Sequence, residues 1–587
     1  MNIFRQHGLT LVPFAHSQNI PSLPQGWKWV YFGTKAHHRS SLEKRFGFAA
    51  RRTFAIELQR QAELLRPRFL TWLQQLGNTQ KSDWWGSNTC YRSPLTSDLF
   101  LHLVFIHLLE SWANEPPFPC IVFIEDPWVL NTALRILPPE KIVGIPPRGL
   151  LKECLLRTLA GLRRLASLAI SSLHLWWLDY KLSREFGSPL SKAPDTIHAI
   201  VTTWLEPRSF EGTSSRLTDP YLGHLSDCIE SSGYNHLVFA LPFTDGKLLK
   251  NLYSSKRGVP WIHLLSLRDL ATCFVSAISF RFHKPIPRFE SKDVSSLLLS
   301  QWFLEWATIF YGTMVRKALV KLTSRATFTN SILFYPFENQ PWEKMAIQGL
   351  RESRFSGKIA ACHTITCPRF FLNYALGPQE AREMPLPDVI LANGAFFQKA
   401  LIQAGFTCPV ENGGSLRFST SPAPFSPAAP EVRAQRTLVL LSSSLEYSLD
   451  LLAYLTRSAT TGHEYLLKAH PDCPETLILA HRPELPSSFT FISGTIHEWI
   501  PRVGSAIHIG TTAALECLMG GVNTMKYIPE RIDLDPLVDL PIFQEQLFDG
   551  TEPNFNRRNA IVPPAMNILS EPIKTSIWEQ LLRSTNP

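Results

Sequence analysis

A run of three serines in the last third of the chain has the residue types and the placement of a phosphate-binding turn. Ser442, Ser443 and Ser444 follow the apolar run Thr437–Leu441 and precede the helical pattern Tyr447–Leu455. Unpaired backbone N–H groups at the start of a helix, together with the helix dipole, favour a bound anion. Serine is also a common N-cap residue, so the turn by itself leaves a binding role and a structural role open.

A lysine and a histidine follow the next predicted strand. Glu464–Lys468 reads as a strand that continues through one alanine into His470 and Pro471, so Lys468 and His470 would lie at its carboxyl end. Open α/β sheets bind their ligands at this edge. A buried structural histidine is the alternative interpretation.

A third segment combines a glycine with two hydroxyl side chains. The predicted strand Ala506–Ile509 leads into Gly510, Thr511 and Thr512, and a helix that carries Glu516 follows. Its first turn would offer backbone N–H groups and two hydroxyls to a phosphate. An ordinary capped helix would have a similar sequence, so this segment is also ambiguous when it is taken alone.

One carboxylate in the first part of the chain has the placement of a general base. Glu338 follows the predicted strand Ser331–Tyr335 and precedes a helix that should begin near Pro341. A carboxylate at a strand end can take the proton of an attacking hydroxyl group. Glu338 could equally cap the following helix, and both roles stay open.

Strands alternate with helical patterns around these segments, which is typical of α/β domains with parallel sheets. Glu125 and Asp126 place two further carboxylates at a strand end. Expected helices include Leu99–Trp112 and Val294–Phe310. The expected strands are Cys120–Ile124, His198–Trp204, His236–Leu241, Trp261–Leu265, Ser331–Tyr335, Lys358–Cys362, Asp388–Leu391, Thr437–Leu441, Glu464–Lys468, Phe489–Ile492 and Ala506–Ile509.

Chain length and one proline-rich segment predict two large domains. The 587 residues exceed the roughly 250–300 residues at which a single core stops growing. Residues 417–435 contain four prolines among Ser and Ala, which can form neither a helix nor a central strand. We therefore expect an N-terminal α/β domain over residues 1–416, a linker over 417–435 and a C-terminal Rossmann-like domain over 436–587.

Residues 151–180 form a basic, apolar helical pattern that we interpret as an insertion in the N-terminal domain. Its uncharged run is shorter than the roughly 20 residues that a membrane-spanning helix needs. Arg157, Arg163 and Arg164 precede this run and Trp176 and Trp177 end it, so the helix could lie in a membrane interface. A helix buried against its own domain is the alternative.

Composition narrows the function classes. The net charge is +9, but the basic residues form no long tract and no nucleic-acid-binding signature is present, so we expect no nucleic-acid partner. The ten cysteines lack paired CxxC spacing, which argues against a zinc site and a disulfide framework. The N-terminal residues do not resemble a secretory signal, so we expect a cytoplasmic protein.

Taken in order, the three polar segments resemble the nucleotide-binding half of GT-B glycosyltransferases, and most closely those that use CMP- or CDP-activated donors, such as bacterial sialyltransferases and capsule Kdo transferases. The resemblance implies that Lys468 and His470 contact the donor phosphate or the cytidine. It also implies that Thr511 and Thr512 bind phosphate and that Glu516 reaches the ribose.

Further strings resemble a family of surface-carbohydrate or O-antigen biosynthesis transferases. The resemblance implies that Glu338 faces an interdomain cleft and that Arg417 supplies positive charge to it. The strings are Asp83-Trp84-Trp85, Ser93-Pro94-Leu95, Glu125-Asp126-Pro127-Trp128, the segment from Tyr335 to Lys344, and Gly413-Gly414-Ser415-Leu416-Arg417.

These resemblances imply an α/β, GT-B-like fold with two facing Rossmann-like domains and a helical insertion in the N-terminal half. The implied activity is transfer of a sugar from a nucleotide-activated donor, with CMP-sugars favoured, to a bacterial surface polysaccharide or a lipid-linked acceptor. We expect no cofactor beyond the nucleotide sugar and no metal ion. A CDP-alditol phosphotransferase and a non-catalytic assembly subunit are the alternatives, and the protein could be peripheral on the inner face of the cell membrane.

Overall fold

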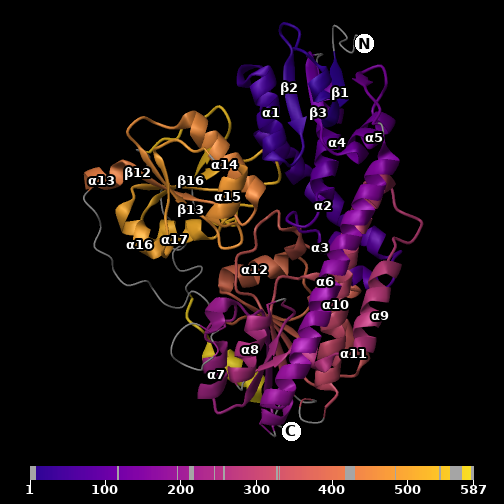
Figure 1. The fold of residues 1–587 in the computed structure, drawn as a ribbon, viewed down its shortest axis with the longest axis vertical. Coiled ribbons are helices and arrows are strands. Elements are labelled where there is room, and N and C mark those ends of the chain that lie inside the picture. Colours follow the sequence, from indigo (N-terminus) through magenta and orange to yellow (C-terminus); the bar gives the residue numbers. More distant parts are fainter. Residues whose placement is uncertain are drawn as a thin grey trace.

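The computed structural model describes residues 8–583 apart from 116–117, 148, 195, 211–216, 218, 244, 256–257, 326–327, 329–330, 417–429, 483, 538, 541–543 and 556–570. Within these residues the chain forms three parallel β-sheets, each flanked by helices (Figure 1). The predicted α/β class with parallel sheets is confirmed. Arg417 and most of the predicted linker lie outside the described residues. The last part of the predicted linker forms the short helix α13 (Pro430–Ala434), so the expectation that this segment forms no helix is wrong there, because Pro430 is at the first position of the helix, where a proline is tolerated.

The first unit is built on a four-stranded sheet of order β2-β3-β1-β4. Its strands are buried on both faces, as expected for a parallel sheet covered by helices. They are β1 (Leu9–Pro13), β2 (Lys28–Phe32), β3 (Cys120–Ile124) and β4 (Ile142–Gly144), and the helices are α1 (Ala36–Phe46), α2 (Ala55–Gly77), α3 (Asn88–Tyr91), α4 (Leu99–Asn114) and α5 (Pro127–Ile136).

The second unit holds a seven-stranded sheet of order β11-β10-β9-β8-β5-β6-β7. Its strands are β5 (Ala199–Thr203), β6 (His236–Ala240), β7 (Gly258–Pro260), β8 (Ile332–Pro336), β9 (Ile359–Cys362), β10 (Val389–Ala392) and β11 (Val410–Asn412). Its shorter helices are α7 (Leu225–Ser231), α8 (Gly246–Ser255), α9 (Leu267–Ser279), α11 (Pro341–Glu352) and α12 (Ala395–Gln403).

Two long helices join the first and second units. They are α6 (Leu150–Phe186) and α10 (Ser295–Thr323), which pack side by side and run along one side of the molecule (Figure 1). Gly161 brings α6 against the backbone of Phe303 in α10, where a Cβ on residue 161 would clash with a carbonyl oxygen. The predicted helical insertion at 151–180 is therefore part of a longer helix that braces two sheets.

The third unit holds a six-stranded sheet of order β14-β13-β12-β15-β16-β17. Its strands are β12 (Arg436–Leu440), β13 (Glu464–Lys468), β14 (Phe489–Phe491), β15 (Ser505–His508), β16 (Asn523–Tyr527) and β17 (Glu545–Leu547). Its helices are α13 (Pro430–Ala434), α14 (Leu445–Ser458), α15 (Glu475–His481), α16 (Ile496–Trp499) and α17 (Ala513–Met519).

The end of the chain returns from the third unit to the second. The helix α19 (Thr575–Arg583) packs on the second sheet, where Trp578 Nε1 donates a hydrogen bond of 3.0 Å to the carbonyl oxygen of Gly413. Gly414 has a φ of +76°, and a Cβ there would clash with the carbonyl oxygen of Pro572. The glycine pair that follows β11 thus allows the returning segment to approach.

Further features differ from the expectations. The predicted C-terminal domain over residues 436–587 does not keep its last helix, because α19 packs on the second sheet. The described part of residues 1–416 contains two sheets, because the connection between them is the continuous helix α6, which has no break that a sequence reader would take for a boundary. The predicted strand Trp261–Leu265 is wrong. Gly258–Pro260 is the strand there, and Trp261–Leu264 is a short 3₁₀ turn that follows it.

Candidate functional site

The three polar segments of the third unit lie at one edge of its sheet. In the parallel register, Leu440 of β12 pairs with Lys468 of β13 and with His508 of β15. Ser442, His470 and Gly510 each follow these paired residues by two positions, and neighbouring strands are only about 4.8 Å apart. The register therefore brings the three segments, whose resemblance to a nucleotide-binding half implies a shared ligand, to one carboxyl edge.

The serine turn combines one buried and two more accessible residues. Ser442 is buried, and its Oγ accepts a hydrogen bond of 3.2 Å from the backbone N–H of Ser444. Ser444 is the N-cap of α14, yet its side chain makes no capping hydrogen bond. The hydroxyls of Ser443 and Ser444 are partly exposed at the start of a helix of 14 residues.

The Lys468–Pro471 segment is partly exposed and braced locally. Lys468 Nζ donates to the carbonyl oxygen of Gly494, which ties it to the turn after β14. The Nδ1 of His470 accepts from the backbone N–H of Asp472 at 3.2 Å, which in a neutral ring leaves the proton on Nε2. Pro471 is exposed.

The Gly510–Thr512 turn depends on a left-handed glycine. Gly510 has a φ of +58°, a conformation that favours glycine. Thr511 is buried and Thr512 partly buried at the start of α17, a helix of only seven residues. Glu516 lies 3.3 Å from His497 Nε2 of α16, within hydrogen-bonding distance of that ring.

Glu338 lies at the carboxyl end of β8, as predicted, in a tightly bonded turn. Gln340 Nε2 donates to its carboxylate at 2.6 Å, and Asn373 Nδ2 donates to its carbonyl oxygen at 2.7 Å. Its backbone N–H donates to Glu343 at 3.0 Å. Glu338 does not line the cavity described next.

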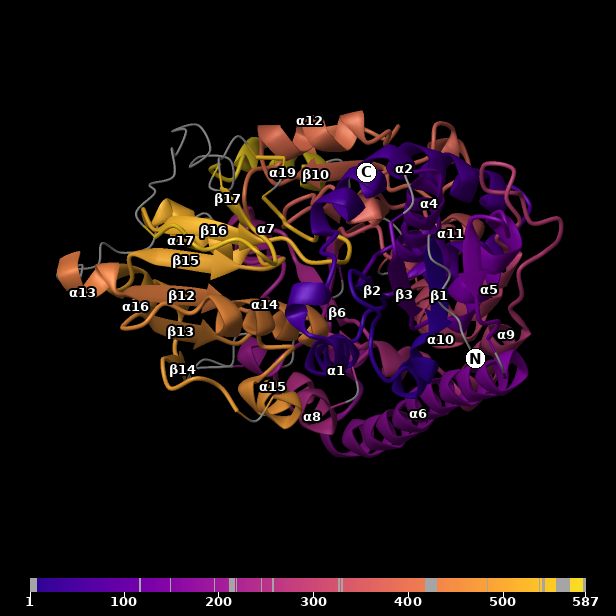
Figure 2. The same cartoon turned by 90° about the horizontal axis from the view of Figure 1, so that it is seen from above.

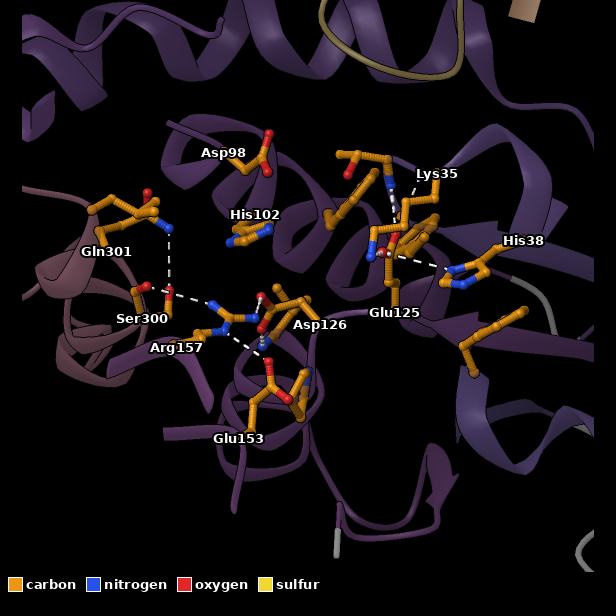
Figure 3. A pocket seen from close by; sticks show the side chains of 18 of the residues that line it. Lys35, His38, Asp98, His102, Glu125, Asp126, Glu153, Arg157, Ser300 and Gln301 are labelled. Carbon is orange, nitrogen blue, oxygen red and sulfur yellow. Dashed lines mark hydrogen bonds and ion pairs between the residues drawn. The ribbon is translucent and has the colours of Figure 1, made fainter. Parts of the chain in front are cut away.

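A cavity of about 500 Å³ opens at the carboxyl edge of the first sheet (Figure 3). Pro13, Phe32 and Ile124 are paired at the ends of adjacent strands. The residues directly after them line the cavity together with side chains from the starts of α1 and α4 and from α6 and α10. The lining includes Phe14, Gly33, Glu125, Asp126, Lys35, His38, Asp98, His102, Glu153, Arg157, Ser300 and Gln301.

Glu125 is the hydrogen-bonding centre of one side of the cavity. It accepts hydrogen bonds from Tyr31 Oη at 2.6 Å and from the backbone N–H of Thr34 at 2.8 Å, and Lys35 Nζ lies 3.5 Å away. Burial raises the pKa of Glu125, but these donors outweigh it and the pKa is lowered. Gly33 makes this possible, because a Cβ there would clash with the Glu125 carboxylate. Glu125 is therefore a fixed anion.

Two aspartates at helix N-caps differ sharply in their contacts. Asp126 caps α5 by accepting hydrogen bonds from Trp128 N at 2.7 Å and Val129 N at 3.2 Å. Asp98 is the N-cap of α4, but its carboxylate makes no capping bond, and no described residue donates a hydrogen bond to it. Burial raises the pKa of Asp98 by more than the nearby charges of His102 and Arg531 lower it. At Asp126 the charges of His102 and Arg157 outweigh burial, and the pKa is lowered.

Basic side chains surround these carboxylates. Arg157 of α6 donates to Asp126 at 2.6 Å and to Glu153 at 2.9 Å. His102, one turn after Asp98 on α4, is buried and its Nδ1 has no partner among the described residues. Figure 3 shows Asp98, His102 and Asp126 around the same open space. The arrangement offers an unpaired carboxylate beside an imidazole, next to fixed charges that can orient a polyhydroxylated ligand.

The carboxyl edges of the first and third sheets face each other. The helix α1, which follows β2, begins with Ala36, whose backbone N–H donates at 2.7 Å to Glu446 at the start of α14. A second cavity, of about 190 Å³, lies at this junction and is lined by Thr34, Asp98, Ser444, Glu446 and Arg531 among others. Asp98 and Thr34 line both cavities, so the predicted serine turn and the unpaired carboxylate share one space.

Buried ion pairs hold this junction together. Arg51 of the first unit binds Glu530 and lies 2.9 Å from Asp549, both in the third unit. Asp450 of α14 lies between Arg39 at 2.7 Å and Arg531 at 2.8 Å. All of these side chains are buried. The two facing edges are therefore fixed relative to each other.

Sequence reasoning missed Asp98, His102 and Arg531 as site residues. Asp98 precedes a helical pattern and looks like any N-cap, and His102 lies within an apolar helix. The available signals were the strand-end carboxylates Glu125 and Asp126 and the neighbouring Ser93-Pro94-Leu95 string. Among the described residues, no group of His, Cys, Asp and Glu side chains could hold a metal ion. The two carboxylates of the Asp533-Leu534-Asp535 string bind Lys526, at 2.7 and 3.0 Å.

No family model matches the chain, and no curated protein matches it significantly. Similar solved structures include a trehalose-6-phosphate synthase from Burkholderia multivorans, with 11% identity, coverage of 66% of this chain and 92% of the other, and a TM-score of 0.34. HepE from Anabaena in complex with UDP-glucose has 13% identity, coverage of 66% and 92%, and a TM-score of 0.32.

A third similar structure is the UDP-GlcNAc 2-epimerase from Neisseria meningitidis bound to UDP-GlcNAc, with 7% identity, coverage of 56% and 82%, and a TM-score of 0.31. At these identities and TM-scores the similarities carry no conclusion about the reaction of this chain.

Proposed function

We propose that this protein is a glycosyltransferase that moves a sugar from a nucleotide-activated donor to a hydroxyl group of a glycan or lipid-linked acceptor. The observation that carries the proposal is the shared space between the first and third sheets. On one side lies the predicted phosphate-binding turn with Ser444, and on the other the unpaired carboxylate of Asp98. A donor and an acceptor bound at these two edges would meet at Asp98.

In the proposed reaction Asp98 is the general base. It takes the proton of the acceptor hydroxyl while the acceptor oxygen forms a bond to the anomeric carbon of the donor sugar. The bond between that carbon and the donor phosphate breaks, and the nucleotide leaves with the electron pair. Glu338, the base favoured by the sequence, remains the alternative.

The departing nucleotide phosphate would be stabilised by groups of the third unit. The start of α14 at Ser443 and Ser444 offers backbone N–H groups and a favourable dipole. Arg531 lies in the same small cavity, and His470 and Lys468 lie along the same sheet edge. Such fixed charges act on the charge that develops in the transition state.

The donor and acceptor classes rest on the sequence. The serine turn, the Lys468–Pro471 segment and the Gly510–Thr512 turn resemble those of CMP-sugar-dependent enzymes, so we propose a CMP-sugar donor. The O-antigen-like strings favour a bacterial surface polysaccharide or its lipid-linked precursor, which would place the protein at the inner face of the cell membrane.

Thermal stabilisation by nucleotides tests donor binding. We expect a cytidine nucleotide to raise the melting temperature, because a ligand of the folded state stabilises it by mass action. The rise should be lost in His470→Ala and kept in His481→Ala, a control on the exposed surface of the same unit. Stabilisation by UDP or GDP alone would discard the CMP-sugar donor, and no response to CMP, CDP, UDP or GDP would contradict the transferase proposal.

Product analysis tests the chemistry. Incubation with a responding nucleotide sugar should release the free nucleotide and transfer or hydrolyse the sugar. Release of a nucleoside monophosphate with transfer of a phosphorylated alditol from a CDP-alditol would identify the phosphotransferase alternative instead.

A further inference from the structure

The helix α6 carries an exposed apolar face in addition to its buried one. We name the exposed face the α6 stripe: Leu151, Leu155, Leu159, Leu162, Ile170 and Leu173. Leu151 is 85% exposed and Ile170 is 66% exposed. With 3.6 residues per turn, the six positions fall within about 100° of arc on a helix about 55 Å long. Monomeric proteins rarely expose a continuous apolar surface of this kind without using it.

The orientation of the stripe is fixed by the opposite face of the helix. Gly161 packs against the backbone of Phe303, and Asp179 accepts a hydrogen bond of 2.7 Å from Tyr253 Oη. Leu165 and Leu175 are buried on the same side. Figures 1 and 2 show α6 on the outside of the molecule. The packing of the buried face therefore fixes the rotation of α6 about its axis, and the stripe faces outward.

Basic and aromatic side chains border the stripe. Lys152, Arg163, Lys181 and Arg184 are exposed on the same helix. At the C-terminal end, Lys181 Nζ lies 3.5 Å from the centre of the Trp177 ring, and Arg184 lies 4.7 Å from that of Tyr180. Trp and Tyr beside basic residues are typical of helices that lie in the headgroup region of a bilayer.

We infer that the α6 stripe is a docking surface for an anionic membrane, on which α6 lies parallel to the bilayer plane. No helix in the described part of the chain is long and apolar enough to cross a bilayer. Anionic headgroups would neutralise the basic border, and the leucines would enter the acyl boundary. A second copy fits less well, because an antiparallel pair of α6 helices would bring the basic ends of one copy against those of the other.

The docking surface lies next to the proposed acceptor site. Glu153, Arg157 and Arg164 belong to the same helix and line the cavity of about 500 Å³. These three residues lie on a face of α6 that is turned at least about 100° away from the stripe, so a lipid-linked acceptor would extend from the headgroups past the helix to reach the cavity. This last step rests on the proposed function, whereas membrane docking itself does not.

Sedimentation of the full chain with vesicles tests the docking. We expect wild-type protein to pellet with phosphatidylcholine vesicles that contain phosphatidylglycerol, and much less with pure phosphatidylcholine. Leu155→Glu with Leu159→Glu should weaken binding by at least about tenfold, because two leucines no longer enter the apolar layer. A double variant of Leu64→Glu and Ile402→Glu is the matched control, since those side chains are 53% and 55% exposed, and it should bind like wild type.

Three results would overturn the inference. They are absence of wild-type binding to the anionic vesicles, unchanged binding of the stripe variant, and a wild-type dimer in light scattering that the stripe variant abolishes. Melting temperatures would show that the variants fold. Turnover with a soluble acceptor separates this inference from the proposed function, and the stripe variant should retain it. If wild type and variants all lack turnover, the glycosyltransferase proposal fails, but the membrane inference still stands on the vesicle data.

Discussion

The carboxyl edges of the first and second sheets occupy equivalent positions in their units but use their carboxylates differently. At the first edge Asp98 faces a cavity and receives no hydrogen bond from the described residues. At the second edge Glu338 is bound by Gln340, and its backbone by Asn373 and Glu343. Glu338 follows its strand and is held in its turn, whereas Asp98 lies at the N-cap of α4 with open space beside it, so Asp98 is the better candidate base.

The surroundings of the second edge reinforce this contrast. Glu343 is buried, and burial, with a smaller contribution from Glu338, raises its pKa to about 8. His363, directly after β9, is buried and its pKa is lowered by burial to about 3. Both groups are neutral near pH 7. The second edge therefore resembles a packed core, whereas the first edge keeps Glu125 and Asp126 ionised.

The largest effect should come from exchanging the bases. Asp98→Asn keeps the shape of the side chain but cannot accept a proton, so we expect turnover to fall by roughly 10²–10⁴-fold. Glu338→Gln should lower turnover much less. The measurement is the rate of nucleotide release with donor and acceptor present. If Glu338→Gln abolishes turnover and Asp98→Asn does not, the general base lies in the second unit and the comparison is reversed.

The first edge also depends on the buried ion pairs that hold it against the third unit. Arg51→Met would leave Glu530 and Asp549 buried without their cation, so we expect a loss of about 3–5 kcal/mol in the free energy of unfolding. Arg351→Met removes the ion pair with Asp388, in which both side chains are exposed, and should cost less than about 1 kcal/mol. Urea denaturation of both variants measures the difference; equal losses would mean that the junction is not specially held.

The pH dependence of turnover should report the free carboxylate. Since burial raises the pKa of Asp98, this base becomes protonated at a higher pH than an ordinary aspartate, whose pKa is about 3.9. Turnover should therefore fall with decreasing pH, starting above that value. Asp126 has a lowered pKa and stays ionised there. A pH–rate profile of Glu338→Gln should keep this acid limb, and its disappearance would contradict the assignment to Asp98.

The sequence predicts the buried strands and their polar ends better than it predicts the first sheet. Strands buried on both faces are continuous apolar runs, and Cys120–Ile124 and Glu464–Lys468 were predicted with the bounds that the structure has. Because the carboxyl ends of parallel strands meet at one edge, the polar segments at 442, 470 and 510 could also be placed together. The strands Leu9–Pro13 and Lys28–Phe32 were missed, and with them the first sheet.

The role of Asp98 could not be predicted because it depends on a contact that is not made. Asp126 and Asp98 both precede a helix, and local sequence makes both ordinary N-caps. Only the fold shows that Asp126 binds the backbone of its helix and that Asp98 does not. Likewise, Arg157 belongs to a basic stretch that the sequence associates with a membrane, yet its guanidinium binds Asp126 in the cavity.

The last expected effect concerns a buried carboxyl group at the second edge. The pKa of Glu343 is about 8 in the folded protein against 4.5 for an unperturbed glutamate, so between these values the native state holds a proton that the unfolded state has released. Stability from this group is complete below pH 4.5 and falls as pH rises toward 8. Glu343→Gln should flatten that slope in pH-dependent urea denaturation.

Glu352→Gln, at an exposed position of the same helix, should retain the wild-type slope. If Glu343→Gln also retains it, Glu343 is ionised in the folded protein. The second edge would then hold a buried negative charge that needs a cation or a ligand. Both edges would carry ionised carboxylates, and the contrast between a packed edge and an open one would weaken.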